Sequence, residues 1–376
     1  MKAWHAVALA TPLLMVAVAC SSGGSASEGS ATDPGGSVAA SAGGSQQGSA
    51  APGAADVDPL VAAFEGPKVD LSGVKLVATT SEPDTLNMGA FFMMDKLRQW
   101  GADVDLVIIT TTSGIQTMMA GRSDLASQGA DEVVLGKSQG ADIKAVGSAR
   151  TKQNYVLVGK DDIKKVSDLK GRTIAMSGPS GFDTLLAKHA LREAGLNVTD
   201  GKFVQIGGSP DRGTALLAGS VDAATIFTST WEQIKPQAKN LHLLEDFAET
   251  TDFPSDAYYA KTDFINKNPD LFLGIACANL EANRWIASSE GQFVEFTERH
   301  VKGVDPAGVK FLWETATKNG MYPTEPDEVI TQEGLKNLQT AMLDAGEIQQ
   351  EVSLDGVVDL SFLEKAKAMG CGQSSK

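Results

Sequence analysis

The stretch TIAMSGPSGFDTLLAKHALREAGL, residues 173–196, combines residue types that can do chemistry. A short apolar run leads into Ser-Gly-Pro-Ser-Gly, and a helical pattern follows. A small-residue turn before a helix can cradle a phosphate, carry a nucleophilic serine, or hold a ligand that never reacts, because the first N–H groups of a helix lack partners within it. Other motifs must separate these three chemistries.

The motifs of hydrolytic and nucleotide-binding enzymes are incomplete. A nucleophile elbow needs Gly-x-Ser-x-Gly, and both GPSGF and GGSPD lack the final glycine. A Walker loop needs a glycine where DEVVLGKS has Asp131. His189, His242 and His300 form no pair at the four-residue spacing of a zinc helix. We therefore predict no catalytic residue, no metal site, no cofactor and no enzymatic activity.

The helix in this stretch has clear start and stop signals. Ser180 can cap it, Asp183 completes a capping box, and Gly195 supplies the C-terminal stop. Small side chains leave the N–H groups of Ser180, Gly181 and Phe182 open, which favours an anionic or polar ligand. A purely structural cap is the alternative interpretation.

The bulk composition predicts an ordinary globular protein with two domains or lobes. The chain has 376 residues, of which 42% are hydrophobic and 21% charged. The net charge of −15 argues against a nucleic-acid partner, which requires a basic face.

The N-terminus predicts export and anchoring. Residues 1–19 read as a signal peptide, with Lys2 followed by an apolar run shorter than a transmembrane helix. AVAC resembles a bacterial lipobox, which predicts lipidation of Cys20; an uncleaved anchor helix is the alternative. Residues 20–56 begin with this cysteine and continue as a Gly/Ser/Ala tether without aromatic residues, which we expect to span roughly 30–35 Å as a coil.

Two further cysteines lie far apart in the sequence. Cys277 and Cys371 are an even pair in a chain that we expect to be exported, which favours a disulfide. The alternative is a buried Cys277 with a free Cys371.

Short apolar runs alternate with helical patterns between residues 75 and 255, which is typical of parallel sheets and an α/β fold. Within this part, helices are expected to start at Ser180, Asp211 and Thr230. The rest of the chain is predicted to be helical, at 268–287, 289–301, 305–318, 331–345 and 361–369.

Several segments together resemble the sulfonate/taurine/nitrate-type substrate-binding proteins of ABC importers, a group that includes thiamine-pyrimidine binders. These segments are SDLKGRTIAM, REAGL, ALLAGSVDAATIF, MMAGRSDLASQGADEV and AKTDFINKNPDLFLGIACANLEANRWI, and the resemblance covers about residues 72–345. It implies a type 2 periplasmic-binding-protein fold, with two α/β lobes, two crossover strands near YVLVGK and DAYYA, and a ligand cleft between the lobes.

Carried onto this chain, the resemblance gives lobe I as 72–156 plus 257–376 and lobe II as 157–256. It implies an extracytoplasmic, lipid-anchored bacterial monomer that delivers a small molecule to an ABC permease and its ATPase. The positions that match the family's cleft loops are Thr80, Ser81, Asn87, Ser127, Gln128, Gly129, Ser180, Gly181, Phe182, Phe227, Thr228, Trp231 and Tyr258.

The side chains in these loops suggest the ligand. Phe182, Phe227, Trp231 and Tyr258 can stack on a planar group, and Met88, Met93 and Met94 can fill gaps. Only Arg150 and Arg212 are nearby cations, and Glu82 and Asp84 lie at the cleft mouth, which disfavours a bare anion. We expect a heteroaromatic compound or an organic sulfonate. A surface sensor and an enzyme on the same fold are the alternative functions.

Overall fold

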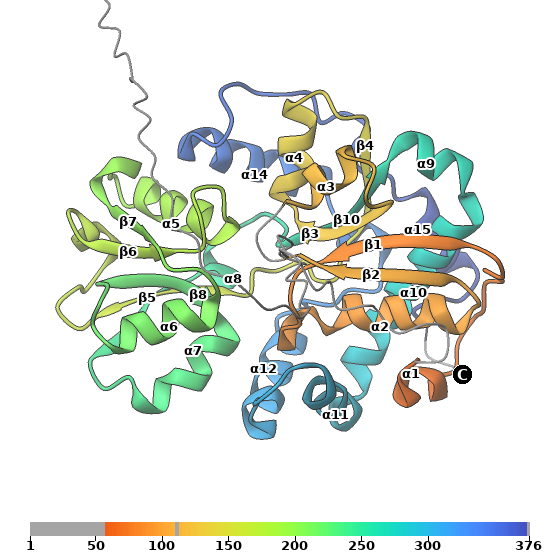
Figure 1. Ribbon diagram of the computed structural model, residues 1–376, viewed down its shortest axis with the longest axis horizontal. Helices are drawn as coiled ribbons and strands as arrows, with labels where there is room; N and C mark the ends of the chain where they lie inside the picture. Colours follow the sequence, from red (N-terminus) through yellow and green to blue (C-terminus); the bar gives the residue numbers. More distant parts are fainter. Residues whose placement is uncertain (1–56, 110–112, 374–376) are drawn as a thin grey trace, which may run out of the picture. The chain divides into compact units, whose positions relative to one another are not determined.

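The structure, a computed structural model, describes residues 57–109 and 113–373. The predictions of a signal peptide, a lipidated Cys20 and a tether lie outside the described residues. The strands form two five-stranded sheets (Figure 1). None of the helices in the described part of the chain combines the length and the apolarity that a membrane span requires.

The first sheet has the strand order β2-β1-β3-β10-β4, and β10 runs antiparallel to both of its neighbours. Its strands are β1 (Lys75–Thr80), β2 (Asp103–Ile108), β3 (Leu125–Gly129), β4 (Ile143–Gly147) and β10 (Asp256–Lys261). The second sheet has the order β7-β6-β8-β5-β9, with β5 antiparallel to its neighbours. Its strands are β5 (Tyr155–Lys160), β6 (Thr173–Met176), β7 (Lys202–Gln205), β8 (Ala223–Phe227) and β9 (Leu241–Asp246).

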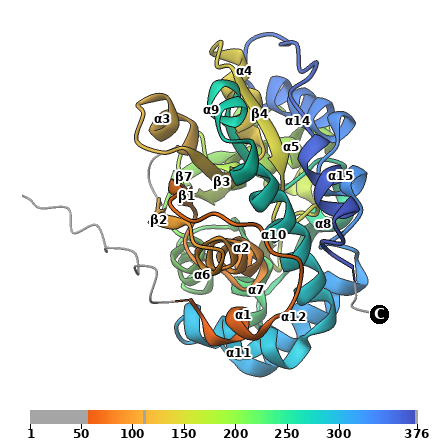
Figure 2. The ribbon, with the colours of Figure 1, turned by 90° about the vertical axis from the view of Figure 1, so that its right-hand side faces the viewer.

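Helices cover both faces of the first sheet (Figures 1 and 2). The 3₁₀ turn η1 (Thr85–Asn87) leads into α2 (Met88–Gln99), which packs on α10 (Pro269–Ser288). Helices α3 (Gly114–Met119) and α4 (Asp131–Ser138) lie on the other side. Strands β3, β4 and β10 are largely buried, which agrees with their short apolar runs, whereas the edge strand β2 exposes Val107 and Ile108.

The second sheet has α5 (Phe182–Glu193), α6 (Ser209–Leu217) and α7 (Thr228–Ile234) as its main helices. The shorter turns around them are η2 (Val166–Leu169), η3 (Val198–Asp200), η4 (Lys235–Gln237) and α8 (Phe247–Thr250). The predicted helix starts at Ser180, Asp211 and Thr230 are each wrong by two residues: α5 begins two residues later, and α6 and α7 begin two residues earlier. None of the three has a side-chain cap, so no capping residue marks their first turns.

The predicted C-terminal helices are present. They are α10, α11 (Glu290–His300), α12 (Pro306–Lys318), α14 (Gln332–Ala345) and α15 (Ser361–Ala368), with the short α9 (Thr262–Lys267) and α13 (Pro326–Val329). Both α10 and α12 begin at proline, which has no N–H to leave unpaired in a first turn. Helix α14 packs against both α4 and α5, so one apolar core touches both sheets.

The C-terminal tail of the described chain is bonded to α10. Cys277 of α10 and Cys371, which follows α15, form a disulfide, and both are buried. A short helix that the sequence patterns did not predict, α1 (Pro59–Ala63), packs on α2.

Candidate functional site

Three of the predicted cleft residues form one row across the first sheet. Thr80 at the end of β1 pairs with Ser127 on β3, and Ser127 pairs with Tyr258 on β10. All three are buried. Because β1 and β3 are parallel, their carboxyl ends meet at one edge of the sheet, which is where open α/β sheets bind ligands.

Arg150 lies next to this row, in the segment between the two sheets. Its Nε donates to Ser255 Oγ at 3.3 Å, and its Nη1 lies 3.5 Å from Asp256 Oδ2. Asp256 Oδ1 also accepts from Ser148 Oγ at 2.5 Å and from the Ala149 amide at 3.0 Å. The carboxylate of Asp256 therefore fixes the backbone before Arg150 and holds the guanidinium in place.

Three buried donors at this sheet edge have no hydrogen-bond partner within the described residues. They are Gln128 Nε2, Arg150 Nη1 and Tyr258 Oη. Burial raises the pKa of the Tyr258 phenol and Asp256 raises it further, while Arg150 partly offsets the shift. The phenol therefore stays protonated and can donate. Buried donors without partners are costly, and a ligand with acceptor oxygens would satisfy them.

Three aromatic rings form a cluster at the strand ends of the second sheet. Tyr155 and Phe227 are paired across β5 and β8, with ring centroids 4.7 Å apart. Phe182, the first residue of α5, lies 6.0 Å from the Tyr155 ring. A Cβ built on Gly129 would lie 3.6 Å from Phe182 Cδ2, so the end of β3 contacts this cluster. The row of Thr80, Ser127 and Tyr258, which we call the polar row, therefore lies next to the aromatic cluster.

The hydrogen bonds of the loop before Phe182 differ from those that the sequence predicts. Gly181 is the N-cap residue and makes no side-chain cap, so the predicted capping box of Ser180 and Asp183 is wrong. Asp183 instead accepts from the Ser177 amide at 2.9 Å and lies 3.7 Å from Arg212 Nε. The carboxylate bonds backward because the buried guanidinium of Arg212 holds it on the strand side of the turn.

The loop after β1 connects to the second sheet's helices. Asn87 donates to Ser81 Oγ at 3.1 Å and accepts from the Asp84 amide at 2.8 Å, so its amide organises this loop. The buried Asp84 accepts from Ser229 Oγ on α7 at 2.5 Å and from Asn154 Nδ2 at 3.4 Å. We call each sheet with the helices that pack on it the first-sheet half and the second-sheet half. Asp84 therefore links the first-sheet half to the second-sheet half by hydrogen bonds.

The remaining predicted residues lie around this centre or in the core. Ser180 and Gly181 line a cavity of about 60 Å³ together with Asp131 of α4. The Thr228 amide donates to Asn154 O. Trp231 packs into the apolar core of the second-sheet half, and the three predicted gap-filling residues Met88, Met93 and Met94 are also core residues.

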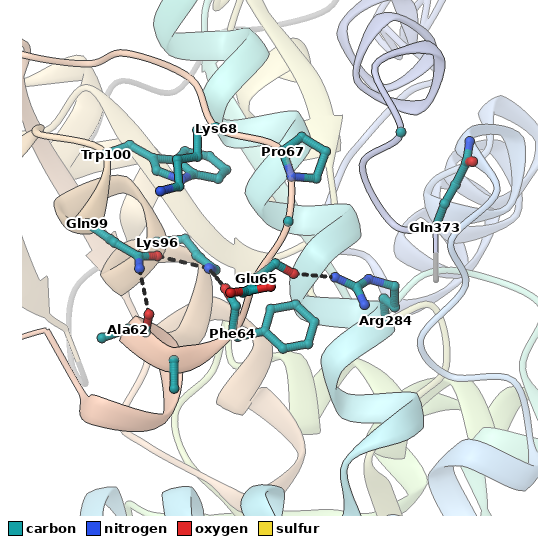
Figure 3. A pocket seen from close by; sticks show the side chains of 13 residues that line it. Ala62, Phe64, Glu65, Pro67, Lys68, Lys96, Gln99, Trp100, Arg284 and Gln373 are labelled. Atoms are coloured by element: carbon teal, nitrogen blue, oxygen red, sulfur yellow. Dashed lines mark hydrogen bonds between the residues drawn. The ribbon is translucent and has the colours of Figure 1, made fainter. Parts of the chain in front are cut away.

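A roomier cavity, about 770 Å³, lies elsewhere, between the segment after α1 and helices α2 and α10 (Figure 3). It contains none of the predicted cleft residues. We place the candidate site at the row of Thr80, Ser127 and Tyr258 and at the aromatic cluster, because donors without hydrogen bonds and aromatic rings converge there. The other cavity is treated separately below.

Neither the histidines nor a cluster of metal-ligating side chains of the described chain contributes to this site. Each described histidine is engaged elsewhere: His189 packs edge-on against Phe253, His242 lies 3.4 Å from Asp161, and His300 packs against Phe296. No group of three metal-ligating side chains occurs within residues 57–109 and 113–373. Donors and aromatic faces without a matched acid/base pair can hold an organic acceptor group in place.

The sequence patterns did not predict that Tyr155, Arg150 and Asp84 belong to the site. The sequence patterns place Tyr155 only in a crossover strand, indicate Arg150 only as a nearby cation, and indicate Asp84 only as a charge that disfavours a bare anion. Their position at the point where the chain passes between the sheets was the available signal, since ligands bind at such crossings.

The comparisons with known proteins agree with this geometry. A family model described as "NMT1/THI5 like" matches residues 98–289, more than half of the chain. The alkanesulfonate-binding protein SsuA from Xanthomonas axonopodis pv. citri, bound to MOPS, is 16% identical over 77% of this chain and 99% of its own, with a TM-score of 0.60. No curated protein matches the chain.

Of two further similar solved structures, one is a binding protein and the other is an enzyme. The periplasmic aliphatic sulphonate binding protein SsuA from Escherichia coli is 21% identical over 75% of this chain and 90% of its own, with a TM-score of 0.57. The desulfurization enzyme DSZB is 15% identical over 79% of this chain and 99% of its own, with a TM-score of 0.57. These likenesses establish the periplasmic-binding-protein fold and confirm the α/β architecture expected from the sequence.

Proposed function

Because the chain belongs to the NMT1/THI5-like family, we propose that it is a solute-binding protein that captures a small organic acid in the cleft between its two lobes. The observation that carries this proposal is the set of buried, unpartnered donors on Gln128, Arg150 and Tyr258, which meets the rings of Tyr155, Phe182 and Phe227. A ligand with acceptor oxygens and a flat or apolar body complements both.

An organic sulfonate is the ligand class that we favour. Its three oxygens can accept from three donors, one of which is the guanidinium of Arg150, whose charge strengthens that hydrogen bond. The similar solved structures named above include two sulfonate-binding proteins, which supports this choice. A heteroaromatic compound with ring acceptors is the alternative, because the aromatic cluster can stack on it.

The remaining parts of the proposal follow from the N-terminal sequence and the family. We assign lobe I to 72–156 and 257–376 and lobe II to 157–256, and the predicted cleft residues, from Thr80 to Tyr258, to the ligand site. A lipid on Cys20 would hold the protein, as a monomer, on the outer face of the cytoplasmic membrane, and the tether would let it reach an ABC permease and its ATPase.

An enzyme on the same fold is the second candidate, since the similar structures include a desulfurization enzyme. The two ionisable donors that we place in the ligand site argue against an enzyme: Arg150 is ion-paired with Asp256, and the buried phenol of Tyr258 stays protonated, so neither forms a nucleophile with a base. A surface sensor would use the same site and differ only in its partner.

A thermal-shift screen tests the proposal. The purified protein is heated with alkyl and aryl sulfonates, nitrate, bicarbonate, thiamine pyrimidines, flavins, purines and aromatic carboxylates. A ligand at 100 times its dissociation constant adds about 2.7 kcal/mol, which raises the melting temperature by several degrees. We expect one chemical class, the sulfonates, to stabilise the protein and to be recovered unchanged.

The other outcomes are decisive. Consumption of the stabilising compound would replace the binding proposal with the enzyme. A folded protein that none of these compounds stabilises would contradict the small-ligand proposal and leave the turn at Ser180 as a structural helix start.

A further inference from the structure

A second cavity, of about 770 Å³, lies on the first-sheet half away from the candidate site (Figure 3). Its walls are the extended segment 64–68 after α1, the last turn of α2 and one face of α10. Its volume falls in the range of pockets that enclose small organic molecules. We call it the basic cavity because its ionisable side chains are mostly cations.

Three cations and two carboxylates set its charge. Lys68, Lys96 and Arg284 line it, with Glu65 exposed at the rim. Glu281, beneath the floor, is fully buried and lies 2.6 Å from Arg284 Nη2. The local sum is one positive charge, in a chain whose net charge is −15. A single negative charge on a ligand would therefore complete the local balance.

The hydrogen bonds inside the cavity leave donor capacity. Lys96 Nζ donates to the carbonyl of Phe64 and to Gln99 Oε1, which accounts for two of its three protons (Figure 3). Arg284 Nη2 donates to Glu65 O at 2.9 Å, while Arg284 Nε is buried and has no partner in the described part of the chain. These groups hold the segment after α1 in place, and the Lys96 ammonium keeps one proton that is not used in these bonds.

The surroundings of Lys96 are unfavourable for its charge in the absence of a ligand. Burial is the largest cause that lowers the pKa of its ammonium to about 8; the neighbouring cations Arg284 and Lys68 act in the same direction, and Glu281 opposes them. An anion placed among these three cations would relieve both the desolvation and the mutual repulsion.

The cavity also has an apolar side. Phe64, Pro67 and Trp100 line it, and the guanidinium of Arg284 stacks over the Phe64 ring at 4.2 Å. A dianion such as phosphate is disfavoured because Glu65 and Glu281 repel it. A carboxylate with an apolar body matches the single charge and the rings together.

We propose that the basic cavity is a second ligand site, which takes a small organic monoanion: a carboxylate that binds Lys96 and Lys68 while its apolar body packs on Phe64 and Trp100. The site is separate from the cleft, so it does not depend on the function proposed above.

Benzoate is a suitable probe, and amide NMR shifts of the purified protein locate its binding. We expect saturable shifts in residues 62–68 and 96–100. Lys96→Met keeps the apolar stem and removes the charge, so it should weaken binding about tenfold or more. Lys68→Gln, at an exposed position that leaves the fold unaffected, should weaken it less. Lys75→Gln, on β1, is the matched control and should have no effect.

A cleft variant separates the two sites. Arg150→Gln should leave benzoate binding at the basic cavity unchanged. The proposal is overturned if benzoate instead shifts residues 127–129 and loses affinity in Arg150→Gln, or if millimolar benzoate produces no saturable shift around Lys96. Unchanged affinity in both lysine variants would overturn it as well.

Discussion

Arg150 is the residue whose chemistry most directly links the fold to binding. Its Nε donates to Ser255, and its Nη1 is ion-paired with the Asp256 carboxylate at 3.5 Å but makes no hydrogen bond within the part of the chain that the structure describes. A buried Nη1 that is ion-paired without a hydrogen bond can still donate to an acceptor oxygen of a ligand. Ser255 and Asp256 position the guanidinium, and a ligand oxygen would supply its missing hydrogen-bond acceptor.

We expect Arg150→Gln to weaken sulfonate binding about tenfold or more, since charge-assisted hydrogen bonds are worth about 1.5–3 kcal/mol. The fold should survive because Asp256 keeps its bonds from Ser148 and Ala149. Calorimetric titration measures the affinity, and Arg122→Gln, at an exposed turn, controls for the lost charge. Equal affinities in the two variants would remove Arg150 from the site.

Lys96 gives a pH dependence with a definite sign. The pKa of its ammonium is about 8 in the folded protein, against 10.5 for an ordinary lysine, because burial desolvates the ammonium. Between these values the unfolded chain binds a proton that the native chain does not, so stability rises with pH across this window. The destabilisation is fully present below pH 8 and is lost as the pH rises toward the unfolded value.

Urea unfolding at two pH values checks this sign. From pH 7.5 to 9.5, the free energy of unfolding of the wild type should rise by about 2 kcal/mol more than that of Lys96→Met. Comparing the two proteins cancels all other titrating groups. Parallel pH profiles would mean that the Lys96 ammonium is well solvated.

Individual elements show what the sequence could and could not predict. The helices 268–287 and 305–318 were placed within about two residues because Pro269 and Pro306 mark first turns. The start of α5 was missed because Asp183 has two possible hydrogen-bond partners in the sequence, and only the buried Arg212, 29 positions away by residue number, decides between them. Local patterns do not contain such tertiary partners.

The disulfide belongs to the scale of elements because it joins α10 to the tail after α15. The bond spans 94 positions, and both half-cystines are buried. Replacing both Cys277 and Cys371 by alanine should lower the free energy of unfolding by about 2–4 kcal/mol, since the unfolded chain regains the entropy of an open loop. The urea midpoint measures this loss. A midpoint that matches the wild type would show that packing on α10 alone holds the tail.

At the scale of the whole molecule, the sequence predicted the class of fold better than the composition of the site. Alternating apolar runs and helices imply α/β layers wherever the chain folds. The row from Thr80 to Tyr258 depends on β10 returning between β3 and β4, a pairing that no local pattern specifies. The family resemblance supplied that topology, whereas the roles of Arg150 and Tyr155 required the structure.

Ser229 provides the test of how the two halves are held. Its hydroxyl on α7 donates to Asp84 in the loop after β1, and both residues are buried, so the bond joins the two sheet-bearing halves through a carboxylate. Ser229→Ala removes this donor and leaves the α7 backbone intact. We expect the ligand-free protein to open, with a larger radius of gyration in solution scattering, and the affinity for the cleft ligand to fall about five- to tenfold. Ser220→Ala, at an exposed turn of the same half, should change neither quantity. If Ser229→Ala also leaves both unchanged, Asp84 serves only its own loop, and closure must depend on the ligand and on the packing of α14 against α5.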